Sequence, residues 1–250
     1  MVNYLKGIAL KRMPPKESYL CSLPVVQCLS KQEELLFHAP VTFLVGENGT
    51  GKSTLLEAIA VALGFNPEGG GRNFAFSTND SHSELWQHLD TLKRAMPNDG
   101  YFLRAESLYN VASYIDELDG EPCPLPPIID AYGGVSLHKQ SHGESFLSLI
   151  QHRFGGDGIY LLDEPEAALS PMRLLTLISE IDRLVNNRSQ LIIATHSPIL
   201  MAYPHAEIIE LSAEGIRKVT YTETEHYQIT KRFLEAPERM LKYLLEETDS

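Results

Sequence analysis

Residues 46–53 read GENGTGKS, and this short stretch constrains the fold more than any other part of the sequence. It matches the pattern of a glycine, four residues, a glycine, a lysine and a serine or threonine that forms a phosphate-binding loop. Residues 41–45 before it are apolar and rich in β-formers, and residues 53–63 after it read as a helix that ends at Gly64. A strand, this loop and a helix in that order predict an α/β fold with a nucleotide at the loop.

The positions of the loop have distinct predicted tasks. Its glycines allow backbone N–H groups to turn inward around phosphate oxygens, since a Cβ would block that approach. Lys52 would reach the β- and γ-phosphates, and Ser53 would bind Mg²⁺ at the N-terminus of the following helix. We therefore expect contacts with the nucleotide from Gly46, Glu47, Asn48, Gly49, Thr50, Gly51, Lys52, Ser53 and Thr54.

Two later apolar runs predict further strands of the same sheet. Residues 159–162 and 191–194 are apolar at successive positions, which is typical of strands buried on both faces of a parallel sheet. Between them, Ser170 can cap and Pro171 can open a helix whose apolar residues follow the helical period. This βαβ crossover predicts a mainly parallel sheet with flanking helices and with its chemistry at the carboxyl ends of the strands.

The middle of the chain is less regular and predicts an inserted helical lobe over about residues 74–157. Within it, residues 100–105 read as a strand, and residues 83–93 and 107–118 carry helix-like patterns.

The last part of the chain predicts a small antiparallel β edge and a terminal helix. Residues 207–211 and 216–221 form the expected hairpin, and residues 229–246 carry a charged amphipathic pattern within a C-terminal segment of 229–250. We expect residues 1–250 to form one domain.

The strand at residues 159–162 is followed by Asp163 and Glu164. A carboxylate at the end of a buried strand can hold Mg²⁺, and the adjacent Glu can orient and deprotonate an attacking water. Two neighbouring acids could instead form a solvated turn, but the phosphate loop upstream favours the catalytic interpretation.

Two more motifs, QSHGE at residues 140–144 and ATHS at residues 194–197, complete a recognisable order. The spacing is 88 residues from Ser53 to Ser141, 22 from there to Asp163 and 33 more to His196. This series resembles the phosphate loop, signature, Walker B and switch histidine of ABC-class P-loop ATPases. The wording DEPEAALSP and ATHSP resembles the heads of the SMC, RecF and OLD-like group, and the whole chain resembles small stand-alone bacterial ATPases predicted to be of AAA or ABC type.

The resemblance implies an ABC ATPase-head fold that works as a head-to-tail dimer with ATP between the subunits. Ser141, Gly143 and Glu144 match the signature that covers the nucleotide of the other subunit, although His142 replaces a glycine. It also implies that Lys52, Glu164 and His196 are the catalytic residues, with His196 donating to the γ-phosphate, and that residues 167–169 touch the partner.

The match weakens at residues 102–107, FLRAES, where this class has a glutamine. Glu106 could hold Mg²⁺ together with Ser53 and Asp163, or it could be a surface acid at a strand end. Arg104 could contact phosphate or pair with a nearby acid. The remaining histidines show no ligand spacing and are interpreted as ordinary side chains, namely His82, His88, His138, His152, His205 and His226.

Charge and hydropathy limit the partners. The formal net charge of −12 argues against a broad nucleic-acid surface, and a basic group at Lys6, Lys11, Arg12 and Lys16 could serve DNA or be a solvated edge. The apolar runs are too short to cross a bilayer, and no secretory signal pattern opens the sequence, so we expect a cytoplasmic protein without direct membrane insertion.

Three functions remain open from the sequence. The first is a Mg²⁺-dependent ATPase whose ATP-bound homodimer operates an effector protein in DNA maintenance or antiphage defence, with DNA a possible further partner. The effector must come from outside, because the space before Ser141 is too short for a long coiled coil and no nuclease-like stretch follows His196. The second is the nucleotide-binding subunit of an ABC transporter. The third, a nucleotide-gated scaffold with negligible turnover, is disfavoured by Glu164.

Overall fold

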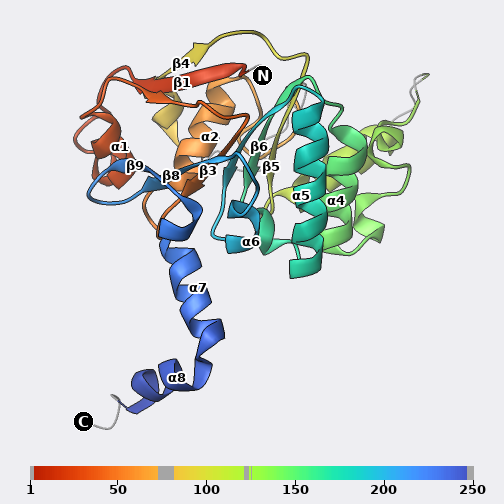
Figure 1. Cartoon of the computed structure of the whole chain (residues 1–250). Coiled ribbons are helices and arrows are strands. Elements are labelled where there is room, and N and C mark those ends of the chain that lie inside the picture. Colours follow the sequence, from red (N-terminus) through yellow and green to blue (C-terminus); the bar gives the residue numbers. More distant parts are fainter. Residues whose placement is uncertain (1–2, 73–81, 121–123, 125, 247–250) are drawn as a thin grey trace.

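A computed structural model describes residues 3–72, 82–120, 124 and 126–246, and its centre is a six-stranded sheet (Figure 1). The strand order is β5-β6-β7-β3-β8-β9. All neighbours pair in parallel except β8 and β9, which form an antiparallel edge. The bounds are β5 Asp99–Arg104, β6 Gly158–Asp163, β7 Gln190–Ala194, β3 Val41–Val45, β8 Glu207–Leu211 and β9 Ile216–Val219. The predicted α/β class, mainly parallel sheet and antiparallel edge are confirmed.

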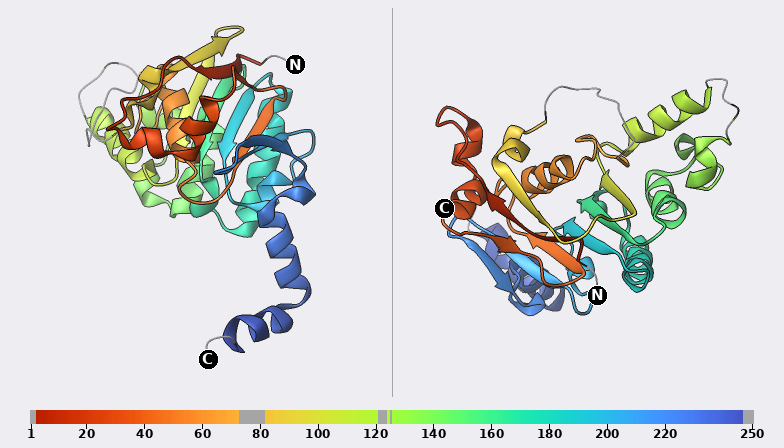
Figure 2. Two further views of the ribbon diagram at one scale, coloured as in Figure 1. Left: turned by 90° about the vertical axis from the view of Figure 1, so that its left-hand side faces the viewer. Right: turned by 90° about the horizontal axis from the view of Figure 1, so that it is seen from above.

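Helices and a second sheet cover the two faces of this sheet (Figure 2). One face carries α2 (Lys52–Ala62) and a three-stranded antiparallel sheet of β2 (Leu35–Leu36), β1 (Leu5–Leu10) and β4 (Leu89–Lys93). The other face carries α3 (Leu108–Gly120), α4 (His142–Arg153) and α5 (Pro171–Asn186). The remaining short elements are η1 Tyr19–Ser22, α1 Pro24–Leu29, η2 Glu84–His88, η3 Ile128–Tyr132, η4 Leu137–Lys139, η5 Pro165–Ala167, α6 Pro198–Met201 and η6 Tyr221–Glu223.

The central strands are apolar throughout because both of their faces are buried. In β3, Phe43 packs in the cluster below α4 and α5, whereas Leu44 packs in the cluster below α2. In β6 the same alternation sends Leu162 to the first cluster and Leu161 to the second. Two-sided burial therefore explains why the sequence shows continuous apolar runs there rather than alternation with polar residues.

Two segments differ from the sequence expectation. Residues 83–93 form η2 and β4 rather than a helix, because β4 pairs with β1, a strand that the sequence pattern did not single out. The single terminal helix expected over 229–246 is two helices, α7 (Glu225–Glu235) and α8 (Pro237–Glu246). Proline disfavours helical backbone in the residue before it, and Ala236 accordingly has φ −151°. Within the predicted lobe and the predicted terminal segment, residues 74–81, 121–123, 125 and 247–250 lie outside the described residues.

The register of the sheet brings distant parts of the chain to one edge. Arg104 at the end of β5 lies opposite Asp163 at the end of β6, and Asp163 lies opposite Ala194 at the end of β7. Ala194 in turn lies opposite Leu44 in β3, one residue before the strand ends. The loops that follow these four strands therefore meet at the carboxyl edge of the sheet.

Candidate functional site

The loop between β3 and α2 requires glycine at defined positions. Gly46, Gly49 and Gly51 all have positive φ, at 140°, 82° and 96°. A Cβ on Gly46 would lie 2.1 Å from the carbonyl oxygen of Leu211, and one on Gly51 would lie 2.5 Å from Cγ1 of Val25. Both backbone conformation and space thus exclude other residues at Gly46 and Gly51.

Lys52 points into this loop. Its side chain is buried, and Nζ donates hydrogen bonds to the carbonyl oxygens of Gly46 at 2.8 Å and Glu47 at 3.0 Å. Burial lowers the pKa of Lys52, while Glu164 and other nearby carboxylates oppose that shift. The ammonium group is therefore held where phosphate oxygens could replace the two carbonyl groups.

Ser53 and Asp163 form the side of the site that fits a divalent cation. The hydroxyl of Ser53 donates to Oδ1 of Asp163 at 2.9 Å. Burial raises the pKa of Asp163 to about 6, although Arg104 and Ser53 oppose the shift. A hydroxyl and a buried carboxylate are oxygen ligands of the kind that Mg²⁺ prefers, and a cation there would offset the cost of the buried charge.

Arg104 pairs with acids rather than standing free for phosphate, which decides between the two interpretations of this residue. Its Nη1 donates to Oε2 of Glu57 at 2.7 Å, and its Nε lies 3.4 Å from Oδ2 of Asp163. Glu57 also accepts a hydrogen bond from the backbone of Ser83 at 2.8 Å. Glu57 was not predicted to belong to the site, although it lies one turn after Ser53 on the same face of α2.

Glu106 is exposed at the rim of a cleft that Ser53, Asp163 and Glu164 also line. It is near enough to raise the pKa of Asp163, after burial and the opposing contacts of Arg104 and Ser53. Across the described part of the chain, no three His, Cys, Asp or Glu side chains cluster with metal-binding geometry. A Mg²⁺ ion here would depend on water and phosphate oxygens besides the protein, as is common for this ion, and metal contact by Glu106 stays a prediction.

Glu164 has a left-handed backbone, with φ 47° and ψ 54°. Non-glycine residues adopt this conformation rarely, and it is characteristic of functional sites. Its N–H donates to the carbonyl oxygen of Ala194 at 3.0 Å, and its Oε1 lies 3.6 Å from Nε2 of His196. The turn out of β6 thus brings the expected base beside the expected switch histidine.

Glu166 and His226, neither of which was predicted to belong to the site, contact the segment after β7. Glu166 accepts hydrogen bonds from the backbone N–H of His196 and, at 2.8 Å, from the hydroxyl of Thr195. His226, at the start of α7, has Nε2 only 2.8 Å from Nδ1 of His196. This contact was not predicted from the sequence, where His226 was interpreted as an ordinary side chain. No local pattern could have revealed this contact, because the two histidines lie 30 residues apart.

Ser141 and Glu144 form a capping box at the N-terminus of α4. The N–H and hydroxyl of Ser141 both donate to Oε2 of Glu144, at 3.0 and 2.6 Å, and the hydroxyl hydrogen bond lowers the pKa of Glu144. Arg173 of α5 approaches both, at 3.2 Å from Oγ of Ser141 and 3.1 Å from Oε1 of Glu144. The side chains of Ser141, His142 and Glu144 remain exposed.

Gly143 joins this segment to the loop after β6. A Cβ there would lie 2.8 Å from the carbonyl oxygen of Ala168 and 2.5 Å from Nη1 of Arg173, so a glycine is needed. Within the described residues, no hydrogen bond or ion pair connects Ser141, Gly143 or Glu144 with residues 46–54. Residues 140–144, the signature segment, thus make no polar contact with residues 46–54 of the same chain in the described structure, and three of their side chains are exposed.

A larger hollow lies on the other side of the phosphate loop, between residues 46–50, the β8–β9 turn and the start of α7. Glu223, Glu225 and Gln228 line it on the α7 side. The start of α7 is therefore part of the wall around the candidate nucleotide site.

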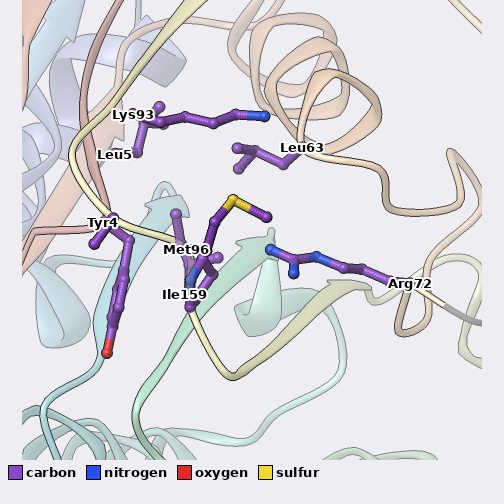
Figure 3. A pocket seen from close by; sticks show the side chains of 9 residues that line it. Tyr4, Leu5, Leu63, Arg72, Lys93, Met96 and Ile159 are labelled. Atoms are coloured by element: carbon purple, nitrogen blue, oxygen red, sulfur yellow. The ribbon is translucent and has the colours of Figure 1, made fainter.

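The small pocket in Figure 3 lies at the opposite edge of the sheet. Tyr4, Leu5, Leu63 and Ile159 line it. Because Ile159 is near the beginning of the strand that Asp163 ends, this pocket is separate from the phosphate site. In the described chain, no helix combines the length and the apolar character that crossing a membrane requires.

Comparisons with known proteins find similarity over most of the chain. Residues 25–100 match a family model described as an AAA domain, and residues 133–202 match a second AAA-domain model whose description names the AbiEii toxin and a type IV TA system. The cytochrome c biogenesis ATP-binding export protein CcmA of Legionella pneumophila (strain Paris) is 32% identical over 164 residues, which cover 60% of this chain and 76% of CcmA.

Two solved structures share the fold at low sequence identity. One is cbiO1 from Clostridium perfringens, part of the ABC transporter complex cbiONQ, with 17% identity, a TM-score of 0.54, and coverage of 98% of this chain and 100% of that one. The other is a metal-chelate type ABC transporter in an inward-facing conformation, with 14% identity, a TM-score of 0.51, and coverage of 92% and 88%.

Proposed function

Because this chain belongs to the ABC-class P-loop ATPases, we propose that it binds ATP with Mg²⁺ and hydrolyses its terminal phosphoanhydride bond. The observation that carries the proposal is the convergence of phosphate, cation and water-activating groups at one edge of the sheet. Lys52 and Ser53 come from the loop after β3, Asp163 and Glu164 from the end of β6, and His196 from the end of β7.

The residues divide the chemistry among them. Lys52 and the N–H groups of the loop bind the β- and γ-phosphates, and Ser53 and Asp163 would hold Mg²⁺, which neutralises phosphate charge when bound. Glu164 takes the proton of the attacking water as the water oxygen bonds to the γ-phosphorus. The bond between that phosphorus and the β–γ bridging oxygen breaks, and ADP leaves with the electron pair. His196 Nε2–H donates to a γ-phosphate oxygen as charge develops.

The active form is a head-to-tail dimer in which each signature segment covers the nucleotide of the other subunit. Exposed Ser141 and Glu144 at the N-terminus of α4 support this, because a helix N-terminus favours phosphate. If ATP binds only the dimer and is present at about 100 times its dissociation constant, it adds roughly 2.7 kcal/mol per site. Hydrolysis removes that contribution and lets the subunits separate.

The dimer acts on an effector protein that serves in DNA maintenance or antiphage defence. The match of residues 133–202 to a model whose description names the AbiEii toxin supports the defence assignment. Residues 102–107 contain no glutamine, although this class has one there. This absence argues against coupling to a membrane subunit.

A second candidate function is the nucleotide-binding subunit of a transporter. It is favoured by the 32% identity to CcmA, which is an export protein by its name, and by the fold shared with cbiO1. In this case the partner is a membrane protein rather than a soluble effector or DNA.

The test of the ATPase proposal uses Glu164→Gln, which removes the base and keeps the ligands of the nucleotide. We expect this variant to bind ATP, to hydrolyse it at least about 100-fold more slowly and to elute as a dimer with ATP and Mg²⁺. Lys52→Ala is the control. It should fail to bind ATP, and its oligomeric state should not change when ATP and Mg²⁺ are added. An E164Q protein that remains monomeric with saturating ATP would refute the dimer.

Separate measurements distinguish the partners. Stimulation of hydrolysis by DNA supports the first function, and co-purification of a membrane protein from solubilised native membranes supports the transporter. Both measurements compare the wild-type protein with K52A. A partner that depends on nucleotide binding should have a weaker effect on K52A, or bind it less.

A further inference from the structure

His226 contacts the switch histidine from a different part of the chain. Its Nε2 lies 2.8 Å from Nδ1 of His196, with ring centroids 4.9 Å apart and ring planes inclined by 60°. This is the geometry of a hydrogen bond between ring edges rather than of stacked rings. One of the two nitrogens must carry a hydrogen and the other must accept it.

The first turn of α7 fixes the position of His226. Thr224 is fully buried and caps the helix, accepting from the N–H of Tyr227 at 3.4 Å. Its hydroxyl donates to the carbonyl oxygen of Tyr221 at 2.8 Å. The rings of Tyr221 and Tyr227 also contact each other, with their centroids 4.5 Å apart. His226 lies between these anchored residues, so its ring is presented to His196 by a well-supported turn.

The surroundings favour neutral rings. Burial lowers the pKa of both histidines, Lys52 lowers both further, and His196 also lowers the pKa of His226. A cation near the N-terminus of α7 is further disfavoured by the helix dipole. The carboxylates that oppose these shifts are Glu164 for His196, and Glu225 and Glu166 for His226.

The far side of His196 decides which nitrogen carries the hydrogen. Its Nε2 is buried, makes no hydrogen bond with the described residues and faces Oε1 of Glu164 at 3.6 Å. A lone pair directed at that carboxylate would be repelled, whereas an N–H would be attracted. A neutral His196 with hydrogen on Nε2 has a lone pair on Nδ1, which can only accept from Nε2–H of His226.

We propose that His226 is a positioning residue that holds His196 in the tautomer with Nε2–H directed toward Glu164 and the γ-phosphate. This inference rests on the proposed ATPase function, in which His196 must donate rather than accept. It assigns a role to the start of α7, whose residues also line the hollow beside the phosphate loop. The two C-terminal helices are thereby connected to the hydrolysis site through one hydrogen bond.

The first test is spectroscopic and needs no hydrolysis. Nucleotide-free protein with ¹⁵N-labelled histidine is studied as wild type, His226→Gln and His226→Leu, with His196→Gln used to assign the signals. Gln can offer an amide N–H where Nε2–H of histidine stood, and Leu cannot. We expect His196 to be the Nε2–H tautomer in the wild type and in H226Q, and a mixture in H226L. A wild-type Nδ1–H tautomer, or unchanged His196 signals in H226L, would overturn the proposal.

The second test is kinetic and uses the same pair of variants. Loss of one hydrogen bond predicts a kcat about 3- to 10-fold lower in H226L, with KM within about twofold of the wild-type value. H226Q should recover most of the lost kcat. Equal defects in H226Q and H226L, or a change confined to KM, would contradict the role. A wild-type protein without ATPase activity would refute the proposed function instead, and the tautomer measurement would still decide the hydrogen bond.

Discussion

Replacing Asp163 by Asn should stabilise the nucleotide-free protein in a way that depends on pH. Asp163 is almost fully buried, and burial raises its pKa from 3.8 to about 6. Ionising it in the folded state therefore costs about 3 kcal/mol more than in the unfolded chain, from a difference of about two pKa units. Asn cannot ionise, so the variant avoids this cost.

The sign of the pH dependence follows from proton binding. Between about pH 4 and pH 6 the folded protein binds more protons at Asp163 than the unfolded chain does. The contribution of Asp163 to the free energy of unfolding is therefore highest at low pH, and it falls as the pH rises through this window. About 2 kcal/mol of the change lies between pH 4.5 and pH 7.5, because the unfolded carboxyl is already largely ionised at pH 4.5.

The assay is urea unfolding of wild type and Asp163→Asn at both pH values, with EDTA and no nucleotide. We expect the free energy of unfolding of D163N, relative to wild type, to increase by about 2 kcal/mol from pH 4.5 to pH 7.5. The attraction of Arg104 for the ionised Asp163 opposes the effect of burial and is already contained in the pKa of about 6, so it needs no separate correction. Asp90→Asn, at an exposed position, is the control and should change stability by less than about 0.5 kcal/mol. If the stability of D163N relative to wild type is the same at both pH values, the raised pKa of Asp163 is refuted.

Three further substitutions test other parts of the structure. Gly46→Ala places a Cβ 2.1 Å from the carbonyl oxygen of Leu211 at φ 140°, so ATP affinity measured by calorimetry should fall by about tenfold or more; wild-type affinity would show that the loop adapts. Gly143→Ala places a Cβ 2.8 Å from the carbonyl oxygen of Ala168, and we expect at least about tenfold weaker ATP-dependent dimerisation in analytical ultracentrifugation. Asp99→Asn should lower the free energy of unfolding by about 1 to 3 kcal/mol at pH 7, because Asp99 accepts hydrogen bonds from Tyr160 and Arg153. Burial alone would raise the pKa of Asp99, but these hydrogen bonds lower it, so the deficit of D99N should shrink as urea unfolding is repeated at pH values falling toward that lowered pKa.

The parts of the site that the sequence predicted are those encoded by short patterns. The strand, loop and helix around Lys52, and the strand that ends at Asp163, need only local spacing and burial to be recognised. The parallel register then brings their ends together without further information. The fold class and the location of the site therefore follow from a few segments of the chain.

The supporting contacts escaped prediction because they join residues that no local pattern connects. Arg104 and Glu57 are 47 residues apart, and His196 and His226 are 30 apart. Residues 83–93 illustrate a different difficulty. Leu85, Leu89 and Leu92 have helical spacing, yet the chain extends at Leu89 to pair with β1, since a short apolar run does not fix its own period.

The two C-terminal helices stand out from the body of the molecule (Figure 1) and carry exposed Ile229, Leu234, Leu241 and Leu244. Helix α7 has 11 residues and is therefore about 16 Å long. It begins at the buried turn at Thr224, beside the histidine pair. A tilt of about 10° at that turn would swing the far end of α7 by about 3 Å, with α8 beyond it moving further. The apolar side chains of α8 are therefore the part of the chain that would move furthest for a given change of angle at Thr224.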